Sequence, residues 1–120
     1  MKPKFSPGKN IAVKVPFHEF ERTVAFYRDT LGFEEVDASS SDDIESVIFK
    51  FGDKNLWIDR VSGISQAEIW LEIITENIEE AAVHFAKNDG IRRDEIEPLP
   101  DGFKGFWVAS PANIIHLISE

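Results

Sequence analysis

The feature that most constrains this sequence is an internal repetition of its apolar pattern. When the second half is laid on the first with an offset of 58 residues, similar residues coincide. The matched pairs are Ile11 with Ile69, Val13 with Leu71, Phe20 with Ile78, Tyr27 with Phe85, and Gly32 with Gly90. A pattern repeated along a chain indicates two copies of one supersecondary unit. We therefore expect two modules of the same architecture.

The first half is predicted to contain one strand, one helix and three further strands. Alternation predicts a strand over 11–15, and an apolar stripe from Phe20 through Val24 and Tyr27 to Leu31 predicts a helix of about three turns. Gly32 is expected to end this helix in a left-handed conformation. Short apolar runs predict strands at 33–36, 47–51 and 56–59, with a turn at 52–55 and a solvated loop at 37–43.

The second half repeats this order. A strand is predicted at 69–74, followed by a helix with Asn77 as N-cap and Glu80 at the acidic position of a capping box. Gly90 is expected to end the helix as Gly32 ends the first. Strands are predicted at 95–98, 105–109 and 114–118. The fold class is therefore predicted to be α+β, with two βαβββ modules.

Composition narrows the possible functions. The 120 residues suit a single domain that buries a core of its own, and a formal charge of -9 opposes nucleic-acid binding. The chain contains no Cys, which excludes thiolate chemistry and sulfur-ligated metals. It shows no membrane span and no apolar signal segment at its start, so we expect a cytoplasmic protein with no nucleic-acid or membrane partner.

Two stretches resemble the vicinal-oxygen-chelate superfamily of glyoxalases, bleomycin-resistance proteins and extradiol dioxygenases. The run VPFHEFERTVAFYRDTLGF, from Val15 to Phe33, is similar to its first-module signature. The run FWVASPANIIHL, from Phe106 to Leu117, is similar to its closing motif but one residue shorter. The resemblance implies one domain over 1–120, with modules at about 9–61 and 67–120, that curls eight strands into a cup. It also implies a homodimer.

The resemblance further implies where metal ligands would stand. Metal-dependent members place His, Gln or Glu on the first and fourth strands of each module, which here correspond to Ala12 and Asp59, then Trp70 and His116. Ala12 and Trp70 have no donor for a cation, and a catalytic divalent ion normally needs three protein ligands. We therefore expect no metal and no other cofactor. The alternative is a Zn, Ni, Mn or Fe site in which Glu72 joins Asp59 and His116.

Strand alternation predicts the lining of the cup, and several of its residues have two interpretations. Trp57 and Trp70 either form walls for a flat ligand or fill the space of a lost site. Lys14 and Glu72 either pair or lie in solvent, and His116 is either a ligand contact or a structural histidine. The lining comprises Ala12, Lys14, Trp57, Asp59, Trp70, Glu72, Ile114 and His116, of which Lys14, Trp57, Asp59, Trp70, Glu72 and His116 are the candidate ligand-binding residues.

Three functions are compatible with this sequence. The first is binding or sequestration of a small molecule at a metal-free site, as the resemblance to bleomycin-resistance proteins implies. The second is a metal-dependent glyoxalase, isomerase or ring-cleaving dioxygenase. The third is a domain kept for association alone, with its cup filled by its own tryptophans. No residue is assigned a catalytic role, and the identity of the ligand stays open.

Overall fold

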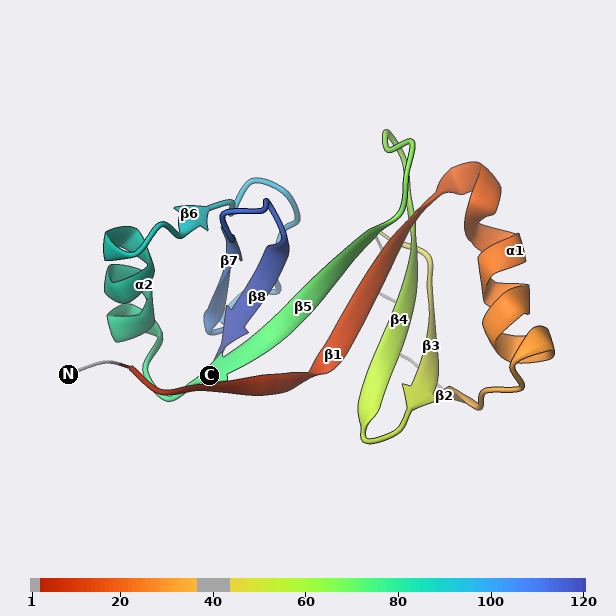
Figure 1. The fold of residues 1–120 in the computed structure, drawn as a ribbon, viewed down its shortest axis with the longest axis horizontal. Helices are drawn as coiled ribbons and strands as arrows, with labels where there is room; N and C mark the ends of the chain where they lie inside the picture. Colours follow the sequence, from red (N-terminus) through yellow and green to blue (C-terminus); the bar gives the residue numbers. More distant parts are fainter. Residues whose placement is uncertain (1–2, 37–43) are drawn as a thin grey trace. The chain divides into compact units, whose positions relative to one another are not determined.

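The computed structural model describes residues 3–36 and 44–120 (Figure 1). Within them, the order of one strand, one helix and three strands occurs twice, which confirms the predicted α+β class and its two βαβββ modules. The chain divides into an N-terminal unit, residues 9–69, and a C-terminal unit, residues 70–120 with the chain start up to Gly8. The predicted solvated loop at 37–43 lies outside the described residues, and the single-domain assignment stays a prediction.

The N-terminal unit contains a four-stranded sheet in the order β2-β3-β4-β1. Strands β1 and β4 pair in parallel, while the other neighbours are antiparallel. The β3–β4 turn is tighter than predicted, since only Gly52 and Asp53 lie outside the strands, and Gly52 adopts a φ of 67° that favours glycine. The strands are β1 (Phe5–Pro16), β2 (Glu35–Val36), β3 (Ser46–Phe51) and β4 (Lys54–Val61).

The first helix is less regular than the apolar stripe predicted. A 3-10 turn, Phe17–Glu19, precedes α1 (Phe20–Ala25), and a π-helical turn, Phe26–Thr30, follows it. The wider turn carries Leu31 out of the stripe, so this residue is 45% exposed and its predicted burial is wrong. Gly32 ends the helix at φ 73°, as predicted.

The core of the N-terminal unit lies between this helix and one face of its sheet (Figure 1). The strands contribute alternate residues to that face, so the remaining residues point to the opposite side. Phe49 and Ile58 are fully buried, and Tyr27 packs against Phe49 with ring centroids 5.9 Å apart. Buried members of this core are Val15, Phe20, Val24, Phe49, Leu56 and Ile58.

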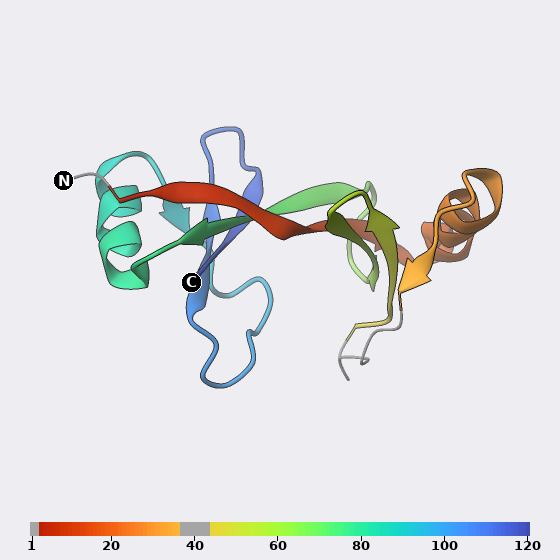
Figure 2. The same cartoon turned by 90° about the horizontal axis from the view of Figure 1, so that it is seen from below.

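The C-terminal unit repeats the arrangement with a sheet in the order β5-β8-β7-β6. Asn77 caps its helix as predicted, because the Asn77 side-chain oxygen accepts a hydrogen bond from the backbone N–H of Glu80 at 3.0 Å. The long β6–β7 connection and the β7–β8 turn lie at opposite ends of β7 (Figure 2). The elements are β5 (Glu68–Thr75), α2 (Ile78–Lys87), β6 (Ile91–Arg92), β7 (Gly105–Ala109) and β8 (Ile115–Ser119).

Two predictions for this half are wrong. The strand expected at 95–98 is irregular chain, because the Ile96 N–H bonds back to the Arg93 carbonyl in a turn. The second strand of this module is instead β6, which lies nearer to α2 in the chain. The left-handed residue after α2 is Asp89, at φ 69°, and not Gly90. Gly90 is needed for a different reason, since a Cβ there would lie 2.8 Å from the Cβ of Phe85.

A second core lies between α2 and one face of the C-terminal sheet. It buries Ala81, Phe106, Val108 and Ile118, with Phe85 at its edge. The chain start completes this unit, because the Phe5 ring packs on Phe85 at a centroid distance of 5.3 Å. Among the helices of residues 3–36 and 44–120, none has the length and hydropathy required to cross a bilayer.

Candidate functional site

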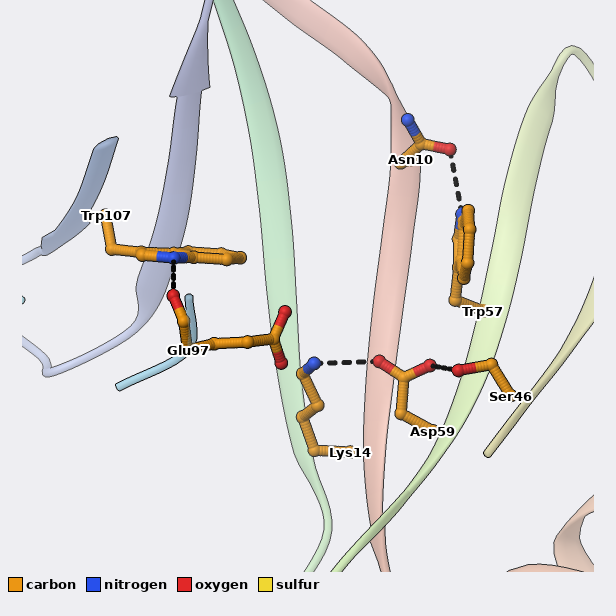
Figure 3. Close-up of polar contacts among 7 residues, drawn as sticks. All are labelled: Asn10, Lys14, Ser46, Trp57, Asp59, Glu97 and Trp107. Atoms are coloured by element: carbon orange, nitrogen blue, oxygen red, sulfur yellow. Dashed lines mark hydrogen bonds and ion pairs between the residues drawn. The ribbon is translucent and has the colours of Figure 1, made fainter. Parts of the chain in front are cut away.

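A buried ion pair occupies the face of the N-terminal sheet that turns away from α1. Lys14 on β1 and Asp59 on β4 stand opposite each other in the parallel register, and Lys14 Nζ lies 2.8 Å from Asp59 Oδ2. The hydroxyl of Ser46 on β3 donates to Asp59 Oδ1 at 2.6 Å (Figure 3). Lys14 and Asp59 are only 3% and 5% exposed. Both oxygens of the carboxylate are therefore engaged by neighbouring strands, as a buried charge requires.

Trp57 lies on the same face, two residues before Asp59. Its indole Nε1–H donates to Asn10 Oδ1 at 2.8 Å (Figure 3). Asn55 Nδ2 donates to the same oxygen at 3.2 Å. These bonds satisfy the polar edge of the half-buried indole. The predicted candidates Lys14, Trp57 and Asp59 are thus brought together on one face.

Trp70 belongs to an aromatic cluster in the C-terminal unit. Its ring meets that of Trp107 edge to face, with centroids 5.1 Å apart, and Trp107 Nε1–H donates to the backbone oxygen of Glu97 at 2.9 Å. The β6–β7 connection supplies Ile96 and Leu99 to the same cluster, whose buried members are Trp107, Ala109 and Ile115. At the start of this connection, the Arg93 guanidinium donates to the Glu95 carboxylate and thereby lowers the Glu95 pKa.

His116 does not lie where the sequence predicted. In the parallel β5–β8 register it stands opposite Leu71, whereas Leu117 stands opposite Glu72. Alternate residues of a strand point to opposite faces, so His116 shares the α2 side of the sheet and not the side of Trp70 and Glu72. The predicted cup lining is wrong at this residue. His116 Nδ1 lies 3.0 Å from the carbonyl oxygen of Ile114.

The internal duplication could have corrected the assignment of His116 from the sequence alone. Lys14 faces Asp59 and Glu72 faces Leu117, so the offset of 58 residues holds for both parallel pairs. Leu117 is thus the counterpart of Asp59, whereas the shortened closing motif had suggested His116. Glu72 lies beside the chain start, where a Cβ on Gly8 would come within 2.5 Å of its side chain. The Lys14–Glu72 ion pair concerns both units and stays a prediction.

The sequence interpretation missed three residues of these clusters. Asn10 and Ser46 share the face of Lys14 and Asp59, and Trp107 shares that of Trp70. Asn10 follows from alternation along β1, since it lies an even number of residues from Lys14. Ser46 depends on the β3–β4 register, in which it stands opposite Asp59, and that register depends on a turn whose length was misjudged.

Solved structures of other proteins share this architecture at low sequence identity. A hypothetical protein from Bacillus halodurans C-125 matches with a TM-score of 0.71 and 14% identity, covering 98% of this chain and 94% of that one. Methylmalonyl-CoA epimerase from Mycobacterium tuberculosis matches with a TM-score of 0.64 and 9% identity, covering 95% of this chain and 87% of that one. The Mn(II)-bound glyoxalase from Novosphingobium aromaticivorans matches with 0.62 and 16%, covering 98% of this chain but only 39% of the other.

This chain has the vicinal-oxygen-chelate fold. Comparison with protein-family models and with curated proteins finds no match. The assignment therefore rests on the arrangement of the strands and helices, and it is an assignment of fold alone.

The donors at the expected ligand positions of the vicinal-oxygen-chelate fold do not fit a divalent ion. In the N-terminal unit, Ala12 offers no lone pair and Asp59 is engaged by Lys14 and Ser46. In the C-terminal unit, Trp70 and Leu117 offer none. Glu72 and His116 face opposite sides of one sheet, so they do not complete the alternative centre. Across residues 3–36 and 44–120, no three His, Asp or Glu side chains are grouped for metal binding.

Proposed function

We propose that this protein binds or sequesters a small molecule without a metal ion, in the manner of bleomycin-resistance proteins. The observation that carries the proposal is the engagement of Asp59, the one carboxylate at an expected ligand position, by Lys14 and Ser46. A cation at Asp59 would have to displace the buried ammonium group of Lys14. We also propose that the protein is a homodimer, as the resemblance implies, and that it is cytoplasmic.

The neighbours of Asp59 indicate the kind of ligand. Trp57 offers an indole ring whose N–H is already bonded to Asn10, so a ligand meets a flat apolar surface. Lys14 and Asp59 compensate each other's charge beside this ring. In the C-terminal unit, taken by itself, Trp70 also offers a partly exposed indole, with Glu72 two residues along β5. This chemistry suits a flat, largely apolar ligand that carries a few polar groups at its edge.

Metal content is the first test. We expect freshly purified protein to contain no stoichiometric Zn, Ni, Mn or Fe by elemental analysis, and added Mn²⁺ to leave its melting temperature unchanged. One metal ion per chain after purification would contradict the proposal. It would favour instead the alternative of a glyoxalase, isomerase or dioxygenase type of enzyme.

Ligand binding is the second test. Bleomycin and the aromatic dye 8-anilinonaphthalene-1-sulfonate serve as probes, read by the change in tryptophan fluorescence. We expect Trp57→Leu to weaken binding of the responding probe about tenfold, because stacking on its partly exposed ring is worth about 1 kcal/mol or slightly more. Trp107→Phe is the matched control, since this residue is only 5% exposed.

The packing of Trp70 on Trp107 also suits the third function, a domain that serves association alone. The same titration separates the two. If neither probe changes the fluorescence of the folded protein, the binding proposal fails, and the tryptophans are then structural.

A further inference from the structure

A cavity of about 210 Å³ lies on the other side of the C-terminal sheet, between the end of α2 and strands β5, β7 and β8. Its walls are partly apolar, with Ile73, Phe85 and Val108 among its lining residues. It belongs to neither tryptophan face described above, because His116, which lines it, points to the α2 side of the sheet. An apolar cavity of about 150 Å³ accepts benzene, so this one has room for a benzene ring with a short polar substituent.

Three of the polar residues that line this cavity, Asn88, Asp89 and His116, have side-chain atoms that can accept hydrogen bonds. The Ile114 carbonyl can only accept, so His116 Nδ1 carries the hydrogen of that bond, and a neutral ring in this tautomer has Nε2 as its acceptor. Asn88 uses its amide nitrogen on the His84 carbonyl, which leaves its side-chain oxygen as an acceptor. Asp89 adds a carboxylate. A ligand that satisfies all three residues must supply several donors.

The electrostatics of this end of α2 favour a positive ligand. A helix C-terminus carries partial negative charge, which stabilises cations in its last turn. Asp89 contributes a full negative charge at the same place, and the chain as a whole has a formal charge of -9. The basic residues of the last turn, His84 and Lys87, line a different hollow on the outer side of the helix, with Glu79 and Val83.

Asp89 is held at the cavity by its backbone. Its φ of 69° lies in the left-handed region, and the Gly90 N–H bonds back to the Phe85 carbonyl at 2.9 Å. Asp is one of the few residues other than glycine that tolerate this conformation. This turn places Asp89 in the lining of the cavity, together with Phe85 and His116.

From this geometry we infer that the cavity is a second binding site, for a small amine with an apolar body. The protonated amine donates to Asp89, His116 Nε2 and Asn88, while the body packs against Ile73, Phe85 and Val108. An arylalkyl ammonium of the size of benzylamine fits both the volume and the charge. This inference does not depend on the proposed function, since it uses the opposite face of the sheet.

The test compares benzylamine with benzyl alcohol and phenylacetate, which carry similar apolar bodies and a neutral or negative head. Each is titrated into the ¹⁵N-labelled full chain, and binding is read from amide shifts. We expect benzylamine to shift the amide resonances of residues 85–90 and 108–116. It should bind at least fivefold more tightly than benzyl alcohol. Phenylacetate should not bind there.

Two charge variants complete the test. Asp89→Asn should weaken benzylamine binding about fivefold, the upper range for an exposed ion pair, while leaving benzyl alcohol unchanged. Asp53→Asn removes one negative charge at the β3–β4 turn of the other unit and should change neither affinity. The inference would be overturned if benzylamine caused no amide shifts or shifted amides outside these two segments. It would also be overturned if benzylamine and benzyl alcohol bound equally, or if Asp53→Asn weakened benzylamine binding as much as Asp89→Asn.

Discussion

At the scale of single residues, burial determines which charges matter. Lys14 and Asp59 are almost entirely removed from solvent and bonded at 2.8 Å, whereas Lys50 and Glu34 form an exposed pair at 3.4 Å. A buried pair is expensive to break, because the remaining partner is left charged and desolvated. An exposed pair is screened by water and contributes little.

We therefore expect Lys14→Met to lower the free energy of unfolding by about 3 kcal/mol, measured by urea denaturation. The double variant Lys14→Met/Asp59→Leu should recover most of this loss, because it removes the stranded carboxylate. Lys50→Met is the matched control and should cost less than about 0.5 kcal/mol. Similar effects of the two single substitutions would contradict the structural role assigned to Asp59.

Asp89 provides a second prediction at this scale, which concerns backbone conformation. At φ 69° a Cβ is disfavoured, although Asp and Asn tolerate this region better than other residues with side chains. Asp89→Ala should lower the free energy of unfolding by about 1 kcal/mol, while Asp89→Asn and Asp89→Gly should leave it nearly unchanged. Urea unfolding midpoints measure the difference. Equal stability of the Ala and Gly variants would show that the turn relaxes.

At the scale of elements, the two helices differ in how they begin and end. The first lacks a side-chain N-cap and loosens into a π-helical turn, while α2 begins at Asn77, whose side chain accepts from the Glu80 N–H. Glu120, next to the end of β8, accepts from the Ile78 N–H at 2.9 Å. The start of α2 is therefore held by both its own cap and the chain terminus.

We expect Asn77→Ala to lower the free energy of unfolding by about 1 kcal/mol, because the Glu80 N–H loses its acceptor. Asn77→Asp keeps an acceptor at the same position and should be nearly neutral, which makes it the matched control. Thermal denaturation followed by circular dichroism measures both. A loss in the Asp variant as large as that in the Ala variant would show that the cap bond is not what matters.

At the scale of the whole molecule, each unit has its own core. Ile58 belongs to the core under the first helix and Ile118 to the core under α2, both are fully buried, and the two clusters share no residue. Residues without shared partners usually contribute independently to stability. The repeated architecture thus has a separate packing arrangement in each half.

We expect Ile58→Val and Ile118→Val each to lower the free energy of unfolding by about 1 kcal/mol through loss of one buried methylene. The double variant should lose about 2 kcal/mol, read from urea denaturation with unchanged m-value. A coupling energy clearly above about 0.5 kcal/mol would contradict independent packing of the two cores.

The sequence by itself determined the fold class and most of the elements, because apolar periodicity reports directly which face of a strand or helix is buried. The offset of 58 residues correctly matched the two modules, and the chemistry of Asn77 and Gly32 correctly placed a helix start and a helix end. Alternation also brought Lys14, Trp57 and Asp59 to one face. Each of these features was read from a pattern within a single strand or helix, or from the repetition of that pattern in the second half.

Only the tertiary structure decided the rest, because it depends on the register between strands distant in sequence. A shift of one residue moves a side chain to the other face of a sheet, and such a shift separates His116 from Glu72 and puts Leu117 in its place. The pairing of Lys14 with Asp59 likewise depends on the parallel β1–β4 register. After α2, the left-handed residue is Asp89, and Gly90 lies where a Cβ would meet Phe85. Local patterns specify which residues alternate, but only strand pairing specifies what each of them faces.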